Sequence, residues 1–259
     1  MALARPLRYF ESRAMVYRHT WRGSAFTTFL NPVLYLAAMG MGLGTLVDDG
    51  SGRAALDSLP YLEFLAPGLL AATAMQTATG DSSFPVMAGI KWVRSYEAAL
   101  ATPLRTHDIV YGHLSWVAAR LAFTSIVFVL IMAFFGAVDW FRGFLALGPA
   151  ILTGMAFGPP VMAFTSTQEH PQGISTLFRF GIIPMFLFSG TFFPVEQLPG
   201  WLQPVAFLTP LWHGVELTRG VALDTATAWS PLSHVAYLTA FAIVGTVLSV
   251  RFLSKRLVI

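Results

Sequence analysis

Long apolar stretches separated by short polar segments dominate the hydrophobic pattern of the chain. About 20 mostly apolar helical residues are needed to cross a hydrocarbon layer about 30 Å thick. We expect six such stretches to form transmembrane helices: 26–46, 62–81, 109–137, 143–165, 174–193 and 231–252. The third is long enough to tilt or to project beyond the bilayer, and Pro184 is expected to kink the short fifth span. The predicted fold class is therefore an all-α integral membrane protein with six spans.

The first 24 residues follow a different pattern, in which apolar residues recur at alternating steps of four and three. These residues are Leu3, Leu7, Phe10, Ala14, Tyr17 and Trp21. Five arginines are interspersed among them. The spacing places an apolar stripe beside a basic face, as in a helix that lies in the membrane interface. We therefore predict an amphipathic interfacial helix over 1–24, with a frayed cytosolic tail as the alternative. A cleaved signal peptide is not expected, because it needs a continuous apolar region.

Composition supports a membrane protein, since 55% of the 259 residues are hydrophobic and only 11% are charged. A soluble domain carries about 25% charged residues. Halving that share means that much of the outer surface does not face water. The net charge of +3 does not indicate a nucleic-acid partner, because basic residues in a membrane chain mainly report topology.

The basic residues are distributed unevenly between the two expected sides of the membrane. Most of the 16 lie before the first span, between the second and third spans, at the C-terminus, or near span starts at Arg120 and Arg179. Only Arg53, Arg142 and Arg219 are left for the other side. Positively charged residues favour the cytoplasmic side. Both termini and the loop 82–108 are therefore predicted to face the cytoplasm, and the protein is predicted to lie in the inner membrane.

The outer connections are expected to differ in kind. Residues 47–60 form an acidic loop, and a tight turn is expected over Asp139 to Arg142. Residues 194–223 are too rich in proline for a simple span and too apolar for a free loop. Short re-entrant or interfacial helices covered by protein fit both properties, because bare backbone cannot face lipid. We expect a single domain over 1–259.

Sites for cofactors or catalysis are not expected. The six histidines show no metal-ligand spacing, and no G-x-x-x-x-G-K-[ST] motif is present to hold a nucleotide. We therefore expect no cofactor on this chain, and any ATP and Mg²⁺ to be bound by a separate ATPase. No acid–base or nucleophile–base spacing indicates an enzyme. Among the acidic residues only Glu63 and Asp81 fall within a span, both near its ends, which disfavours a proton-coupled carrier.

Two glycines in the first span, Gly40 and Gly44, are four residues apart. Glycines at this spacing let another helix approach the backbone closely. They are expected to serve helix packing within the chain or contact across a dimer interface.

A charged segment, KWVRSYEAALATPLR, interrupts the apolar pattern between the second and third spans, and prolines bracket it. On one helix, Trp92, Tyr96 and Leu100 share a face, while Arg94 and Glu97 lie on another and are able to pair weakly. We predict a short amphipathic helix at the cytoplasmic surface, either a mechanical lever or an ordinary surface helix without a partner.

Polar and aromatic residues within the spans are candidates for a substrate path. Hydroxyls, amides and rings in such positions can contact sugars and lipid, although helix packing is the alternative for each. The candidates are Thr73, Gln76 and Thr77 in the second span and Phe188, Ser189, Thr191 and Phe192 at the end of the fifth.

Four stretches, at 30–44, 61–78, 96–112 and 186–220, carry a resemblance to a known family. The chain resembles the permease subunit of type-2 ABC (ATP-binding cassette) exporters over essentially its full length. It is most similar to the nodulation-factor exporter branch, the NodJ-like permeases, which export lipooligosaccharide. The stretch 186–220 is the most specific, because it combines a short apolar span with the proline-broken segment.

The resemblance implies two permease subunits, with a homodimer favoured over a heterodimer, and a dimer of ABC ATPases that binds ATP and Mg²⁺. It implies that 82–108 holds the coupling helix, which docks on the ATPase. The implied docking residues are Lys91, Trp92, Arg94, Tyr96, Glu97 and Leu100. An amphiphilic, glycolipid-like substrate would pass from the inner leaflet outward, in contact with membrane lipids.

Other functions are compatible with the same pattern. Efflux of hydrophobic drugs or antibiotics, and export of O-antigen or teichoic acid, use the same architecture. Outside ABC transport, the alternatives are a proton-coupled carrier and a non-transporting membrane scaffold. A neighbouring gene for an ATPase with a nucleotide-binding motif would separate ABC transport from these two.

Overall fold

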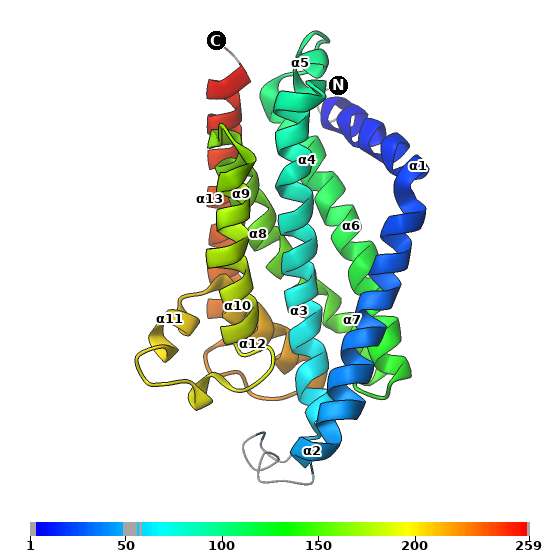
Figure 1. Cartoon of the computed structure of the whole chain (residues 1–259), viewed down its shortest axis with the longest axis vertical. Coiled ribbons are helices and arrows are strands. Elements are labelled where there is room, and N and C mark those ends of the chain that lie inside the picture. The colour runs from blue at the N-terminus through cyan, green and yellow to red at the C-terminus, as the bar shows by residue number, and fades with distance from the viewer. Residues whose placement is uncertain (1–3, 49–55, 57–58, 258–259) are drawn as a thin grey trace.

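The computed structural model describes residues 4–48, 56 and 59–257, and these form a helical bundle without strands (Figure 1). Both chain ends and α5 (Ser95–Leu100) lie at one end of the bundle, which we call the terminal end. The opposite end, where α2 (Gly44–Asp48) and α7 (Trp140–Leu145) lie, is called the distal end. The all-α prediction is confirmed for the described residues.

The helices vary widely in length, and three π-helical segments interrupt them. The remaining elements are α1 (Ala4–Tyr35), π-helical η1 (Leu36–Leu43), α3 (Tyr61–Ser82), α4 (Phe84–Met87), π-helical η3 (Ala88–Trp92), α6 (Thr106–Phe134), α8 (Leu147–Thr167), α9 (Pro171–Leu177), π-helical η4 (Phe178–Ile182), α10 (Ile183–Phe188), 3₁₀-helical η5 (Val195–Gln197), α11 (Gln203–Phe207), α12 (Pro210–Leu223) and α13 (Pro231–Leu257).

Four helical stretches are long and apolar enough to cross a membrane: Thr28–Asp48, Thr106–Phe134, Trp140–Thr167 and Pro231–Leu257. The second predicted span is also helical in the structure, and the fifth, predicted over 174–193, is helical only as far as Phe188. They correspond to α3 and to the run from α9 to α10, which lie alongside the longer helices (Figure 1). The chain is thus a multi-pass membrane protein, and the count of six spans stays a prediction.

Helix α1 continues from the N-terminal segment into the first candidate span, and Figure 1 shows that it bends on the way. Part of the predicted apolar stripe packs on protein. The rings of Phe10 and Tyr17 lie 5.7 and 5.3 Å from that of Trp116 on α6, and Tyr9, which is not part of the predicted stripe, is also buried. Leu7 is exposed, so that the stripe is only partly covered by α6. The interfacial position of this segment stays a prediction.

The centre of the bundle is α8, which packs against α13, α3 and α6. Close approach to α13 depends on Gly245, where a Cβ would overlap the ring of Pro160. Small residues at such crossings are typical of membrane helices, because packing rather than the hydrophobic effect holds these helices together. The helices that join the terminal and distal ends are therefore in direct contact.

The two glycines of the first span face α3 of the same chain. A Cβ at Gly40 would overlap Leu62 Cδ1, and one at Gly44 would lie 3.9 Å from Tyr61 Cδ1. The structure therefore shows the within-chain packing, while contact across a dimer interface stays a prediction.

The turn between α6 and α7 differs from the prediction. Instead of a turn over Asp139 to Arg142, the chain reverses at Gly136, whose φ is 73°. Glycine adopts positive φ without steric cost. Asp139 instead caps α7, since its carboxylate accepts hydrogen bonds from the backbone amides of Phe141 and Arg142 at 3.0 and 3.4 Å. Further along the chain, η4 changes to π-helical hydrogen bonding just before Pro184, which lacks an amide donor.

Residues 194–223 form three short helices at the distal end, namely η5, α11 and α12. Helix α12 is mostly buried and packs against α3, α8 and α13. The expectation of short helices matches this arrangement, but only α12 is covered by protein, since Val205 and Leu208 at α11 are 54% and 70% exposed. Insertion of these helices into the membrane stays a prediction.

Candidate functional site

The charged segment between α3 and α6 is not one continuous helix, which corrects the prediction. The π-helical η3 ends at Trp92, Arg94 adopts a left-handed conformation with φ of 52°, and α5 begins at Ser95. Trp92, Tyr96 and Leu100 consequently share no exposed face: Trp92 is 59% exposed, Tyr96 is 1% exposed and Leu100 is half-buried. The break at Arg94 reorients α5 relative to η3, a rearrangement that helical spacing alone does not predict.

Tyr96 is turned into the protein and anchors α5. Its ring lies edge-on to that of Tyr9, 6.0 Å away, and packs against Gly89, where a Cβ would come within 2.9 Å of Tyr96 Cε1. Burying a tyrosine ring contributes a large apolar area. Of the six predicted docking residues, Tyr96 is therefore positioned to hold the segment rather than to contact a partner.

Four neighbouring side chains remain exposed at the terminal end: Trp92, Val93, Arg94 and Glu97. We call them the exposed edge. Arg94 Nη1 lies 4.0 Å from Glu97 Oε2, and the two side chains are 71% and 54% exposed. Such a pair contributes little to stability in water. Its charges are therefore available to a partner protein, beside two large apolar side chains.

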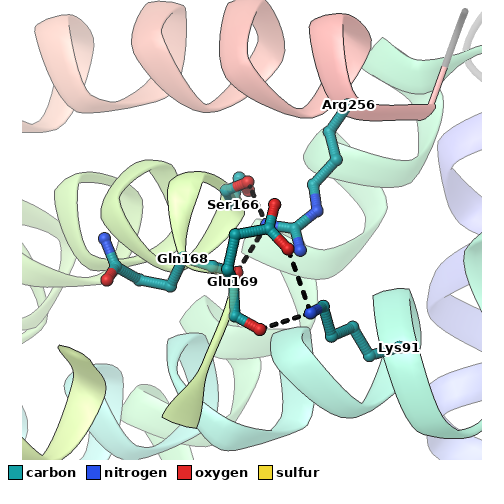
Figure 2. A network of polar contacts seen from close by, with 5 residues as sticks. All are labelled: Lys91, Ser166, Gln168, Glu169 and Arg256. Atoms are coloured by element: carbon teal, nitrogen blue, oxygen red, sulfur yellow. Dashed lines mark hydrogen bonds and ion pairs between the residues drawn. The ribbon is translucent and has the colours of Figure 1, made fainter. Parts of the chain in front are cut away.

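Lys91, next to the exposed edge, is fixed to a distant part of the chain. Its ammonium donates to the backbone carbonyl of Glu169 and lies 3.2 Å from Glu169 Oε2 (Figure 2). Glu169 lies in the turn between α8 and α9. Hydrogen bonding and the charge of Lys91, with a smaller contribution from Arg256, lower the pKa of the Glu169 carboxyl.

The same turn is held from α13. Arg256 Nη1 donates to the backbone carbonyls of Ser166 and Gln168, both at 2.7 Å (Figure 2). These carbonyls end α8, where a cation satisfies acceptors that lack a helical partner. Lys91, Glu169 and Arg256, which we call the polar clamp, thus join η3, the α8–α9 turn and α13. The sequence analysis did not identify Glu169 or Arg256 as partners of Lys91, although three polar residues before Pro171, Gln168 to His170, indicate a turn.

The candidate path residues fall into two separate places. Thr73, Gln76 and Thr77 line one cleft between α1, α3 and α6, with a volume of about 250 Å³. The other four lie after η4 and do not line it. Ser189 and Thr191 are fully buried, with Ser189 Oγ 2.8 Å from Thr209 Oγ1.

The two rings of this second group have different surroundings. Phe192 packs edge-on to Phe186 at 5.0 Å, whereas Phe188 is 39% exposed. The structure therefore brings together the three polar residues of α3, and it does not bring them to the residues after η4.

Arg219 is a buried hub at the distal end that the sequence analysis counted only as an outer charge. It is 8% exposed and donates to the backbone carbonyls of Gly190 and Phe64 at 2.8 and 3.1 Å. Its guanidinium also lies 3.8 Å from the centre of the Phe64 ring. Glu216, three residues earlier on α12, lies 3.5 Å from Arg219, and this charged pair in an otherwise apolar stretch was the available signal. Arg219 thereby ties α12 to α3 and to the turn after α10.

Two histidines form a buried pair beside this hub. His213 Nδ1 lies 2.9 Å from His234 Nδ1, so one ring donates to the other, and Trp212 and Trp229 pack around them. The pair joins α12 to α13.

The family of the chain follows from comparison with known proteins. Residues 12–223, which include the exposed edge, the polar clamp residues Lys91 and Glu169, and Arg219, match the ABC-2 type transporter family. The chain belongs to the ABC-2 type transporter family. The predicted resemblance to NodJ-like type-2 ABC permeases is confirmed.

Individual relatives of this ABC-2 chain cover most of its length. Nodulation protein J of Sinorhizobium fredii is 35% identical over 92% of this chain and 89% of its own. Nodulation protein J of Rhizobium meliloti is 32% identical over the same shares. The inner membrane transport permease YadH of Escherichia coli is 25% identical over 75% of this chain and 73% of its own.

Proposed function

We propose that this ABC-2 chain is the permease subunit of an ATP-driven exporter. Two copies would assemble with two ABC ATPase subunits, which bind ATP and Mg²⁺, and would move an amphiphilic, glycolipid-like substrate from the inner leaflet outward. Family membership supports a permease. The structural observation that carries the coupling role is the exposed edge, which presents apolar and charged side chains beside the polar clamp.

The proposed mechanism uses the connections of the exposed edge. ATP binding would move the ATPase subunits and displace α5 and η3. Tyr96 packs with Tyr9 of α1, and Lys91 is bound to the α8–α9 turn. Close-packed interiors transmit displacement rather than absorb it. A push on the exposed edge would therefore reach α1, α8 and α13 together and shift the bundle between packed states.

The proposal includes an orientation: six spans, with both termini and the exposed edge in the cytoplasm of an inner-membrane protein. The chain contains no cysteine, so single cysteines can report sidedness. Trp92 at the terminal end and Trp201, 76% exposed between η5 and α11, are suitable positions. In spheroplasts, a membrane-impermeant maleimide should label Trp201→Cys and should label Trp92→Cys only after permeabilisation. The opposite pattern would reject the orientation.

Charge reversal at the exposed edge tests the coupling role. The double variant Arg94→Glu, Glu97→Arg should hydrolyse ATP with its partner without moving substrate, because the docked register of the two charges is lost. Arg8 and Glu11 on α1 provide a matched control, since they form another exposed pair three residues apart, at 3.3 Å. Reversing both control charges should leave coupling intact. Normal coupling in the Arg94 and Glu97 variant would refute the assignment.

A further inference from the structure

The N-terminal half of α1 carries two exposed arginines that have no acidic partner. Arg18 and Arg22 lie four residues apart and therefore on the same side of the helix. Neither forms an ion pair with any of the described residues. Arg8, closer to the start of the helix, is instead paired with Glu11 at 3.3 Å. We call Arg18 and Arg22 the basic face, since their charges are uncompensated.

Large apolar side chains lie among these arginines. Met15, three residues before Arg18 and seven before Arg22, shares their side of the helix and is 64% exposed. Trp21, next to Arg22 in sequence, is 48% exposed. A membrane surface receives both kinds of side chain, because apolar groups enter the acyl boundary while arginine heads stay with the headgroups. The combination therefore indicates contact with lipid rather than with bulk water.

The basic face lies at the level expected for lipid headgroups. The first candidate span begins at Thr28, six residues after Arg22, which corresponds to about 9 Å of helix. The headgroup layer extends roughly 5–8 Å beyond the hydrocarbon on each side. Because α1 bends, its N-terminal half runs obliquely to the span and rises less than its length (Figure 1). Both arginines are thus close enough to reach phosphate oxygens with their long side chains.

Packing on α6 fixes which side of α1 faces outward. The ring of Tyr17 lies 5.3 Å from that of Trp116, and the guanidinium of Arg120 lies 5.1 Å from the centre of the Tyr17 ring. A Cβ at Gly112 of α6 would overlap the backbone carbonyl of Pro6. The helix cannot roll about its axis without breaking these contacts. The basic face is therefore presented in a fixed orientation, which lowers the entropy cost of binding.

We propose that the basic face binds the headgroups of anionic phospholipids, such as phosphatidylglycerol, in preference to zwitterionic ones. A guanidinium matches a phosphate group with two parallel hydrogen bonds, and Arg18 and Arg22 have no carboxylate that competes. The choline of phosphatidylcholine offsets the charge of its phosphate, whereas phosphatidylglycerol keeps a net negative charge. The assignment of this surface to the inner leaflet rests on the proposed function, and the headgroup preference does not.

A fluorophore beside the basic face can measure which lipid gathers there. The chain has no cysteine, so Thr20→Cys, at an exposed position, allows the fluorophore NBD to be attached at one place in the full-length protein. The protein is placed in nanodiscs of phosphatidylcholine with a small share of phosphatidylglycerol, and one of the two lipids carries a quenching doxyl group near its headgroup. The measured quantity is the quenching per mole by phosphatidylglycerol divided by that by phosphatidylcholine. This ratio should exceed one in the parent Thr20→Cys protein.

Neutral substitution of the two arginines should remove the preference. Arg18→Gln with Arg22→Gln should lower the quenching ratio roughly fivefold for each arginine, until it approaches one. Arg251→Gln with Lys255→Gln is the matched control, because it removes two exposed cations from α13 and should leave the ratio unchanged. Added salt should weaken the preference in the parent protein. All four substituted side chains are exposed, so the melting temperature should not change.

A ratio of one in the parent protein, or an unchanged ratio in the Arg18 and Arg22 variant, would overturn the proposal. Loss of the preference on adding inorganic phosphate at constant ionic strength would also overturn it, because the face would then be a site for a free anion. Loss of assembly with the ATPase in this variant, at an unchanged ratio, would assign the face to the partner protein instead. Failure of the proposed function is distinguishable, because absent ATP-driven export would leave the ratio unaffected.

Discussion

Lys91 and Glu169 lie 78 positions apart in sequence, yet the ammonium of one lies 3.2 Å from the carboxylate of the other and also binds its backbone carbonyl. This contact fixes the base of the exposed edge to the turn between α8 and α9. Arg256 holds the same turn from α13. The segment between α3 and α6 is therefore held against the bundle through Lys91 and Tyr96, and it presents the exposed edge away from the bundle.

Charge exchange at the polar clamp should change coupling more than stability. We expect Lys91→Glu to lower the amount of substrate moved per ATP, because like charges would separate η3 from the α8–α9 turn. Adding Glu169→Lys should restore part of the lost coupling, because the two charges attract again. The recovery should be incomplete, because the hydrogen bond from Lys91 to the backbone carbonyl at position 169 is still missing. Paired ATPase and transport assays in proteoliposomes measure the amount of substrate moved per ATP hydrolysed.

The melting temperature provides the control for this exchange. Glu169 is largely exposed, and an exposed ion pair contributes little to folding. A large loss of thermal stability in Lys91→Glu, with an unchanged transport ratio, would assign the polar clamp to folding alone.

The Glu169 carboxyl should titrate below its ordinary range. Lys91 lowers its pKa, so the ion pair is fully present above the ordinary glutamate value of about 4.3 and is lost as the pH falls through the lower native value. Its contribution should therefore be constant between about pH 6 and 8. NMR titration of ¹³C-labelled glutamate would follow the carboxyl. Lys91→Met should raise the pKa of Glu169, and an unshifted titration in that variant would exclude the pairing.

Removal of Arg219 should destabilise the distal end. Arg219→Ala leaves the carbonyls of Phe64 and Gly190 without this donor, at about 1–3 kcal/mol for each acceptor that stays buried and unsatisfied. Arg219→Lys should be only partly tolerated, because a single ammonium cannot reproduce the fork of the guanidinium. The seven tryptophans allow melting to be followed by intrinsic fluorescence. A wild-type melting temperature for Arg219→Ala would show that water or lipid replaces the hydrogen bonds that Arg219 donates.

Close packing of α8 and α13 should make Gly245 intolerant of a side chain. Gly245→Ala would place a methyl group against the rigid ring of Pro160, with an expected cost of about 1–3 kcal/mol. Gly148→Ala in α8 is the matched control, because its Cβ meets nothing within 4 Å and alanine favours the helix. Fluorescence-detected melting should fall for the first variant and not for the second. Equal melting of the two would contradict the packing.

Helical character was predictable from the sequence because it depends on the length and polarity of local stretches. The predicted third span, 109–137, matches α6 at 106–134 to within three residues. Long-range partners were not predictable. Periodicity placed Tyr96 beside Trp92, whereas a left-handed residue at position 94 turned Tyr96 toward Tyr9.

The candidate sites show the same limit. Thr73, Gln76 and Thr77 were identified by their polarity in an apolar helix, and the structure places them on one cleft. Their link to Arg120 and Asp81 required the packing of α3 on α6. Ser189 and Thr191 carry similar polarity but are enclosed by protein, which the sequence pattern did not reveal.

The central claim is that this permease has no driving force of its own and receives it at the exposed edge. The most direct test is ATP-dependent movement of a fluorescent glycolipid in proteoliposomes, with and without the partner ATPase. The account predicts movement only when ATPase and ATP are both present, and its loss when Arg94 and Glu97 are reversed while hydrolysis continues. Movement by the permease alone, driven by a proton gradient, would contradict it.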